Sequence, residues 1–328
     1  MTSTAGRYLG LMLVTAMTGA AACASSPEGA PSTSSAADAG VSVSDQVNAG
    51  RPAEVRLCYS ATSQAHPARR AFWDALRSGD TRVRAQVIAD LEAAVTALPN
   101  EEELALLLGL AHLWRLAEPT SAESSDVSIT VQSAARAKAE LERAYTLCPT
   151  DHRIPAWLGP VLINGGRAMG NAQMVEQGFT VLQQGIDHYP QFVLFSKLLA
   201  YANEPADSAD FTKALDAVSA NIGYCGNGDN LRADPACMNT FQAAHNIEGS
   251  MVFLGDVYAK AGKKDDALGF YAQAKSAGTY GAWQWKDLLE ERVRTIDARL
   301  AAYRTTATTD DPASAWTSTV QCSICHRQ

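Results

Sequence analysis

The 328-residue sequence has few charged residues, and residues that favour strands are comparatively sparse. Asp, Glu, Lys and Arg make up 19% of the chain, below the roughly 25% of an average soluble domain. Much of the difference is alanine, the strongest helix former. Basic residues are outnumbered, 27 against 35 acidic ones, so the chain lacks the basic balance typical of nucleic-acid binding. We therefore expect an all-α protein that binds no nucleic acid.

Short catalytic motifs are missing as well. The sequence contains no G-x-S-x-G, no H-E-x-x-H, no G-x-G-x-x-G and no phosphate-binding P-loop. Of the histidines, His66, His112, His152 and His188 are isolated, and His112 lies in an apolar helical stretch typical of a satisfied core residue. The sequence predicts a protein that is not an enzyme.

The N-terminus lacks a hydrophobic run long enough for a comfortable membrane span, which needs about 20 residues. It has one basic residue, Arg7, then an apolar stretch from Tyr8 to Met17, then small residues. This order is typical of a secretory signal peptide, which we assign to residues 1–22.

The end of that signal, Ala20-Ala21-Ala22-Cys23, resembles the lipobox of bacterial lipoproteins. The resemblance implies that Cys23 carries the lipid, and Ala24 after it implies an outer-membrane lipoprotein that faces the periplasm or the cell surface. Ordinary cleavage after Ala24 is the alternative. Residues 23–52 are rich in Ser, Ala, Gly and Pro and are expected to form a flexible tether.

The body of the chain shows a repeated pattern. Pro99, Pro149 and Pro190 each end an Ala-rich segment, and ten residues after each comes a small residue preceded by leucine, at Gly109, Gly159 and Ala200. The clearest unit is residues 248–281, with Leu-Gly-x-x-Tyr followed by Ala-x-x-x-Tyr-x-x-Ala.

This pattern resembles the tetratricopeptide (TPR) repeat, in which pairs of helices stack into a solenoid. The resemblance implies a TPR-like solenoid over residues 53–281, in which the small residues let the two helices of a pair approach closely. An unrelated helical bundle is the alternative. We expect a polar loop over 117–132, one capping helix over 282–303 with Trp283 and Trp285 in its core, and a flexible tail over 304–328.

The seven cysteines include one at the proposed lipid site, which leaves six in an exported chain. Cys225 and Cys237 flank a loop without periodicity and are predicted to form a disulfide. Cys58 and Cys148 could also pair, but their spacing carries no information. In the loop, Asp229, Asn230 and Asp234 do not have calcium-loop spacing, so we expect no metal there.

The most specific motif is Cys322-Ser323-Ile324-Cys325-His326, the C-x-x-C-H signature of covalent c-type haem. It resembles cytochromes c over five residues, which implies thioether bonds from Cys322 and Cys325 and a proximal iron bond from His326. His245 and Met251 are candidates for the sixth ligand. A Cys322–Cys325 disulfide or a zinc site is the alternative.

The sequence thus predicts an envelope scaffold with covalent haem c that transfers electrons or docks a redox partner. The alternative is a haem-free scaffold that binds a peptide or helix of a protein partner.

Overall fold

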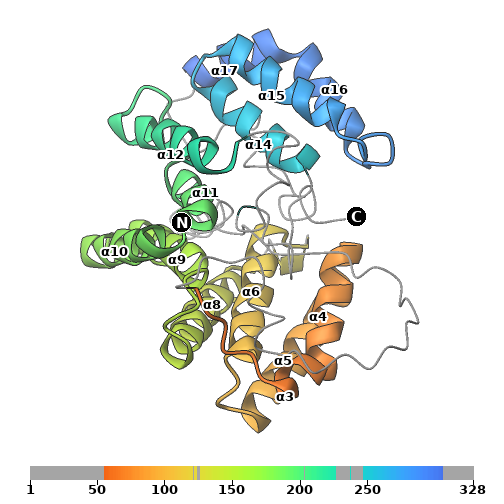
Figure 1. The fold of residues 1–328 in the computed structure, drawn as a ribbon, viewed down its shortest axis with the longest axis vertical. Coiled ribbons are helices and arrows are strands. Elements are labelled where there is room, and N and C mark those ends of the chain that lie inside the picture. Colours follow the sequence, from red (N-terminus) through yellow and green to blue (C-terminus); the bar gives the residue numbers. More distant parts are fainter. Residues whose placement is uncertain are drawn as a thin grey trace, which may run out of the picture.

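The computed structural model describes residues 55–120, 122–123, 126–202, 204–226, 237 and 247–305. Over these residues the chain forms thirteen helices and no strand (Figure 1), which confirms the all-α class. The helices are α3 (Ala61–Ala65), α4 (Pro67–Ser78), α5 (Arg84–Ala97), α6 (Glu102–Ala117), α8 (Val127–Leu147), α9 (Ile154–Met169), α10 (Ala172–His188), α11 (Pro190–Ala202), α12 (Ala209–Cys225), α14 (Ile247–Lys260), α15 (Lys264–Ser276), α16 (Lys286–Arg294) and α17 (Ile296–Thr305).

The helices pack mainly against their neighbours in the chain. The most extensive contacts join α6 with α8, α9 with α10, α11 with α12 and α14 with α15, and α4 packs on α5 in the same way. Each of these hairpins then packs on the next, through α5 and α6, α8 and α9, and α10 and α11. The result is a row of stacked helical hairpins (Figure 1), as expected of a helical repeat.

Small residues lie where the two helices of a hairpin touch. A Cβ atom added to Gly255 on α14 would lie 2.4 Å from Cε1 of Tyr271 on α15. One added to Gly159 on α9 would lie 2.4 Å from Cγ of Leu182 on α10. Because real Cβ contacts are never this short, larger side chains would push the helices apart. The predicted role of the Leu-Gly positions in close helix packing is therefore correct at these two hairpins.

Apolar side chains form two cores that meet at α11. The first runs from the segment before α3 to α11, and the second from α11 to α17. Phe192 and Val193 of α11 belong to the first core, whereas Leu198 and Leu199 belong to the second. One helix thus joins both halves of the array.

Helix ends follow the prolines closely. α5 ends at Ala97, α8 at Leu147 and α10 at His188, each just before one of the three prolines.

The predicted polar loop at 117–132 is shorter than expected, because α8 begins at Val127. The carboxylate of Asp126 caps it by accepting a hydrogen bond from the Ser128 N–H at 2.8 Å.

The C-terminal cap also differs from the prediction. In place of one helix over 282–303 there are two, α16 and α17, divided at Thr295. Arg292 on α16 forms an ion pair of 2.8 Å with Asp256, which is fully buried on α14, and Arg299 on α17 approaches the same carboxylate at 3.7 Å. The break lets both helices direct an arginine at one buried charge. Trp283 is buried in the second core, as predicted.

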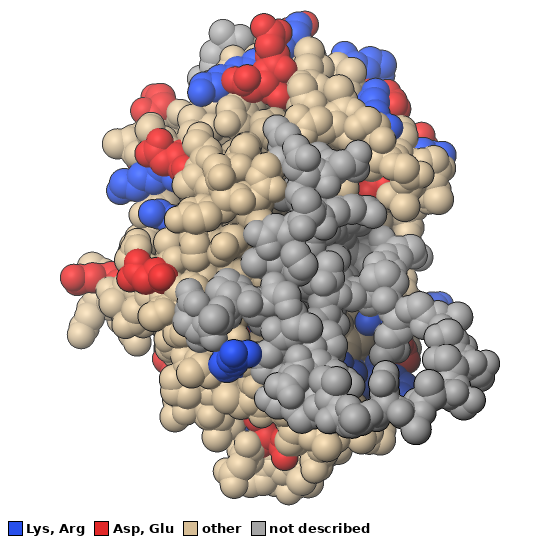
Figure 2. Space-filling view, in the orientation of Figure 1, with Lys and Arg blue, Asp and Glu red and all other residues tan. Residues whose placement is uncertain are grey.

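None of the helices in the described part of the chain is both long and apolar enough to cross a membrane. On the face shown in Figure 2, outside the grey residues, acidic and basic side chains are interspersed. This visible surface carries no extended patch of one sign.

Candidate functional site

Most residues that the sequence assigns to a site lie outside the described residues. They are Cys23, His245, Cys322, Cys325 and His326, and the loop residues Asp229, Asn230 and Asp234, where no metal is expected, also lie outside. Nothing in the fold therefore bears on the haem motif directly.

Of the two candidates for the sixth haem ligand, only Met251 lies within the described residues. Its side chain on α14 is fully buried in the second core. Its role as a ligand stays a prediction from the sequence.

The four cysteines within the described residues form two disulfides. Cys225 is joined to Cys237, as predicted, with their Cα atoms 5.6 Å apart. Cys58 is joined to Cys148, with their Cα atoms 5.8 Å apart, across a sequence separation of 90. The spacing of Cys58 and Cys148 could not reveal this pair, because only the fold brings the first residues of the domain to the end of α8.

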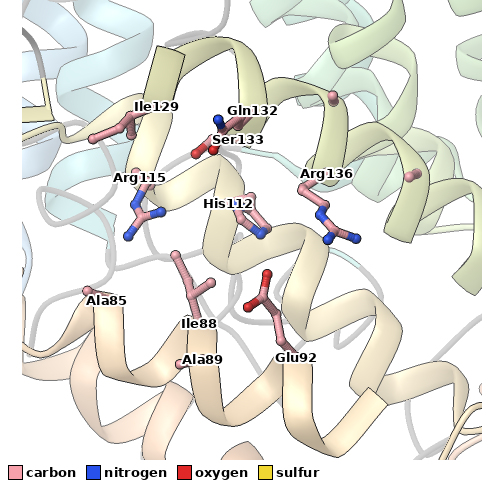
Figure 3. Close-up of a pocket in the computed structure, with 12 residues that line it drawn as sticks. Ala85, Ile88, Ala89, Glu92, His112, Arg115, Ile129, Gln132, Ser133 and Arg136 are labelled. Atoms are coloured by element: carbon pink, nitrogen blue, oxygen red, sulfur yellow. The ribbon is translucent and has the colours of Figure 1, made fainter. Parts of the chain in front are cut away.

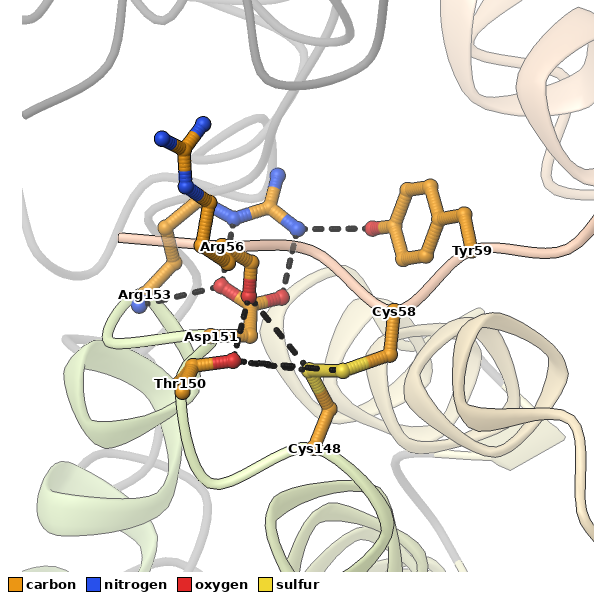
Figure 4. Close-up of a disulfide and its surroundings, with 7 residues drawn as sticks. All are labelled: Arg56, Cys58, Tyr59, Cys148, Thr150, Asp151 and Arg153. Carbon is orange, nitrogen blue, oxygen red and sulfur yellow. Dashed lines mark hydrogen bonds and ion pairs between the residues drawn. A yellow bond between two sulfur atoms is a disulfide. The ribbon is translucent and has the colours of Figure 1, made fainter. Parts of the chain in front are cut away.

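The segment 55–60 is held against the α8–α9 turn by more than this disulfide (Figure 4). The Arg56 N–H donates to the Thr150 carbonyl at 3.0 Å, and the Thr150 hydroxyl donates back to the Arg56 carbonyl at 2.8 Å. Val55, Leu57 and Tyr59 are buried on alternate positions of this extended segment. It closes the N-terminal end of the first core.

A buried ion pair lies beside the same segment (Figure 4). Arg153 donates to both carboxylate oxygens of Asp151, at 2.8 and 2.6 Å, and its Nη2 also donates to the Tyr59 hydroxyl at 2.7 Å. Both charged side chains are almost fully buried. Such a pair needs every partner, because removal of one leaves an uncompensated buried charge. Its role here is to position the N-terminal segment.

Glu102 completes this polar cluster from the start of α6. Burial raises the pKa of its carboxyl well above the usual range, and the nearby Asp151 carboxylate raises it further. The ionised Glu102 carboxylate would have no hydrogen-bond donor, whereas the protonated acid can donate a hydrogen bond to Asp151.

A different set of polar groups faces an open cleft of about 670 Å³ (Figure 3). α5 and α8 form its walls and α6 its floor. Its apolar surface comes from Ile88 and Ile129 with several alanines, and its polar surface from Glu92, His112, Arg115, Ser133 and Arg136, with Gln132 at the edge. These residues come from three helices that follow one another in the described part of the chain.

His112 lies at the floor of this cleft. It is 4% exposed, and neither Nδ1 nor Nε2 has a hydrogen-bond partner within the described residues. Burial, reinforced by the positive charges of Arg115 and Arg136, lowers its pKa to about 4. The imidazole is therefore neutral at neutral pH. The sequence-based expectation of a satisfied core histidine is right about its burial and wrong about its hydrogen bonds.

The two arginines of the cleft have different surroundings. Arg115 pairs with Glu123 at 2.9 Å, and Glu123 also pairs with Arg84. Arg136 is exposed on α8 and forms no ion pair with any described residue. Its guanidinium is thus available to an anion, whereas that of Arg115 is already held.

Two of the histidines predicted to be isolated are in contact. The rings of His152, in the turn before α9, and His188, at the end of α10, stack with their centroids 4.1 Å apart. They are 36 residues apart in the sequence, so only the hairpin could bring them together. No group of three or more His, Cys, Asp or Glu within the described residues is arranged to hold a metal ion.

The fold and this geometry define an all-α protein of stacked helical hairpins with a polar cleft. No protein-family model matches the chain, and searches of curated proteins and of solved structures find no match.

Proposed function

We propose that this protein is an exported, TPR-like scaffold that carries a covalent c-type haem and takes part in electron transfer or docks a redox partner. Cys322 and Cys325 would form the thioethers, and His326 would bind the iron on the proximal side. Cys23 would carry a lipid that anchors the protein in the outer membrane.

The observation that carries the proposal is the pairing of the other cysteines. Four of the seven are used in the Cys58–Cys148 and Cys225–Cys237 disulfides. With Cys23 assigned to lipid, only the two cysteines of the C-x-x-C-H motif remain. Two disulfides also suit an oxidising compartment outside the cytoplasm, where c-type haem is attached.

The haem itself supplies one-electron chemistry when it is bound. The chain's own residues would hold it covalently through two thiols and supply one axial ligand. His245 and Met251 stay the candidates from the sequence for the distal ligand, and Met251 is buried in the second core.

The stacked hairpins support the scaffold part of the proposal. Gly159 and Gly255 lie at helix contacts that admit no side chain, the role that the TPR resemblance gives to these positions. A solenoid of this kind offers an extended surface to a peptide or helix of a partner. In a haem-bearing protein, that partner would be the redox protein.

A denaturing gel with a peroxidase stain tests the proposal, because a covalent haem survives denaturation. In protein made by a host that matures c-type cytochromes, we expect a stained band, mainly in the membrane fraction. The variant Cys322→Ser/Cys325→Ser should lose the stain, while Cys225→Ser/Cys237→Ser should keep it.

A colourless wild-type band with a Cys322–Cys325 disulfide, identified by mass spectrometry, would contradict the haem. That result would favour the second candidate, a haem-free scaffold for a protein partner. The hairpin array supports this candidate equally, because none of the described contacts depends on haem.

A further inference from the structure

We propose that the cleft between α5, α6 and α8 binds a small ligand with one carboxylate and an apolar body. This site is separate from the haem motif and does not depend on the proposed redox function. Three observations carry it: the volume of the cleft, the guanidinium of Arg136 and the imidazole of His112, neither of which has a partner among the described residues.

The size of the cleft fits a small organic molecule. Ligand pockets are usually about 300–1,000 Å³, mostly apolar, with a few convergent polar groups. The cleft has about 670 Å³, and Ile88 and Ile129 face it from opposite walls. An apolar body of a few carbons can lie between these two side chains.

Arg136 is the anchor for the carboxylate. Its guanidinium points into the cleft from α8 (Figure 3) and has no ion pair with any described residue. A guanidinium binds a carboxylate through two parallel hydrogen bonds, which gives both affinity and orientation. Arg115 adds positive charge from α6 while Glu123 holds it in place.

His112 supplies the second polar contact. A buried ring with two unpartnered nitrogens costs free energy, which a ligand recovers when it accepts from or donates to the imidazole. The neutral ring offers one donor and one acceptor. A carboxylate placed between His112 and Arg136 would also favour the protonated ring, so binding should take up a proton below about pH 6.

Glu92 limits the charge of the ligand. Its carboxylate points into the cleft from α5 (Figure 3), opposite the two arginines. A second negative charge on the ligand would be repelled by it. The charged groups that face His112 are thus Glu92 from α5, Arg115 from α6 and Arg136 from α8, and together they select a monoanion.

Hexanoate is a suitable probe, and its neutral counterpart hexanamide is the control. With the full mature chain, the NMR signals of the His112 ring should shift saturably with hexanoate, and the pKa of His112 should rise. Hexanamide should bind at least about tenfold more weakly, because it lacks the charge that Arg136 recognises.

Two substitutions separate the anchor from a general charge effect. Arg136→Gln should weaken hexanoate binding at least about tenfold. Arg70→Gln removes an exposed arginine on α4, outside the cleft, and should leave binding unchanged. Equal weakening by both variants, or no saturable shift with any free acid up to about 20 mM, would overturn the proposal.

The same carboxylate chemistry could come from a free acid or from the C-terminus of a peptide. N-acetyl-Ala-Leu as the free acid, compared with its amide, distinguishes them. Tighter binding of the peptide acid than of hexanoate identifies a peptide terminus, and the reverse identifies a free acid. Repeating the titration with Cys322→Ser/Cys325→Ser separates this site from the haem, because binding should be unaffected.

Discussion

His112 has deep burial and no hydrogen-bond partner within the described residues, a combination that makes its titration visible in protein stability. Its pKa in the folded protein is lowered to about 4 from the usual 6.5. Between these two pH values the unfolded chain takes up a proton that the folded chain does not. Stability is therefore complete above about pH 6.5 and falls as the pH drops towards 4.

The substitution His112→Leu should remove this loss. At neutral pH the variant should be at least as stable as the wild type, because leucine leaves no polar atom unpaired. On lowering the pH from 6.5 to 4, its advantage should grow to as much as about 3 kcal/mol. Urea unfolding at several pH values measures the difference. Parallel pH profiles for the two proteins would contradict the assigned cause.

At the same scale, the burial of a single residue can be predicted from the sequence, but the side chains that it contacts cannot. The apolar surroundings of His112 predict its burial, but its missing partners depend on how α5 and α8 face each other. Likewise, nothing local to His152 and His188 indicates that their rings stack. Such contacts join different elements of the chain, so they appear only once the hairpins are packed.

At the scale of the helix pair, glycine positions offer a sharp comparison within one hairpin. Gly255 on α14 faces Tyr271 with no room for a Cβ atom. A Cβ atom added to Gly269 on α15 would have no neighbouring side chain or other helix within 4 Å. Gly255→Ala should destabilise the protein by about 1–3 kcal/mol, because the helices must separate or Tyr271 must move.

Gly269→Ala is the matched control, and it should stabilise the protein by up to about 1 kcal/mol through helix propensity alone. Thermal unfolding of both variants gives the two changes. The two stability changes should have opposite signs. A loss of stability in both variants would contradict the assignment of the Gly255 effect to its contact with Tyr271.

Helix elements are predictable where a local signal marks their ends. The three prolines mark the ends of α5, α8 and α10. A leucine followed by a small residue marks the first helix of several hairpins. The start of α8 is marked only by its capping residue Asp126, because its first residues include Ser, Thr and Val, which have modest helix propensity. No local signal marks the division between α16 and α17, whose arginines Arg292 and Arg299 meet Asp256 on α14, far from them in the sequence.

At the scale of the whole molecule, the two disulfides should contribute unequally to the stability of the fold against unfolding. Cys58–Cys148 spans 90 residues and Cys225–Cys237 spans 12. In the chain-entropy description, the longer loop contributes about 4–5 kcal/mol and the shorter about 3 kcal/mol.

The variant Cys58→Ser/Cys148→Ser should therefore lose more stability than Cys225→Ser/Cys237→Ser. It should also release the segment 55–60, which hydrogen exchange at Arg56 would detect as faster exchange. Guanidinium unfolding compares the two variants. A smaller loss for the Cys58–Cys148 variant would show that the ion pair of Asp151 and Arg153 holds this segment without the disulfide.

The sharing of α11 between the two cores limits how the array can be divided. Its Phe192 and Val193 complete one core, while Leu198 and Leu199 begin the other. A cut before α11 would leave the earlier hairpins with an uncovered apolar face, and a cut after it would do the same to the later ones. The chain therefore has no point near α11 at which two independent folding units could be separated, exchanged or joined to other proteins, although the row of hairpins suggests modular construction.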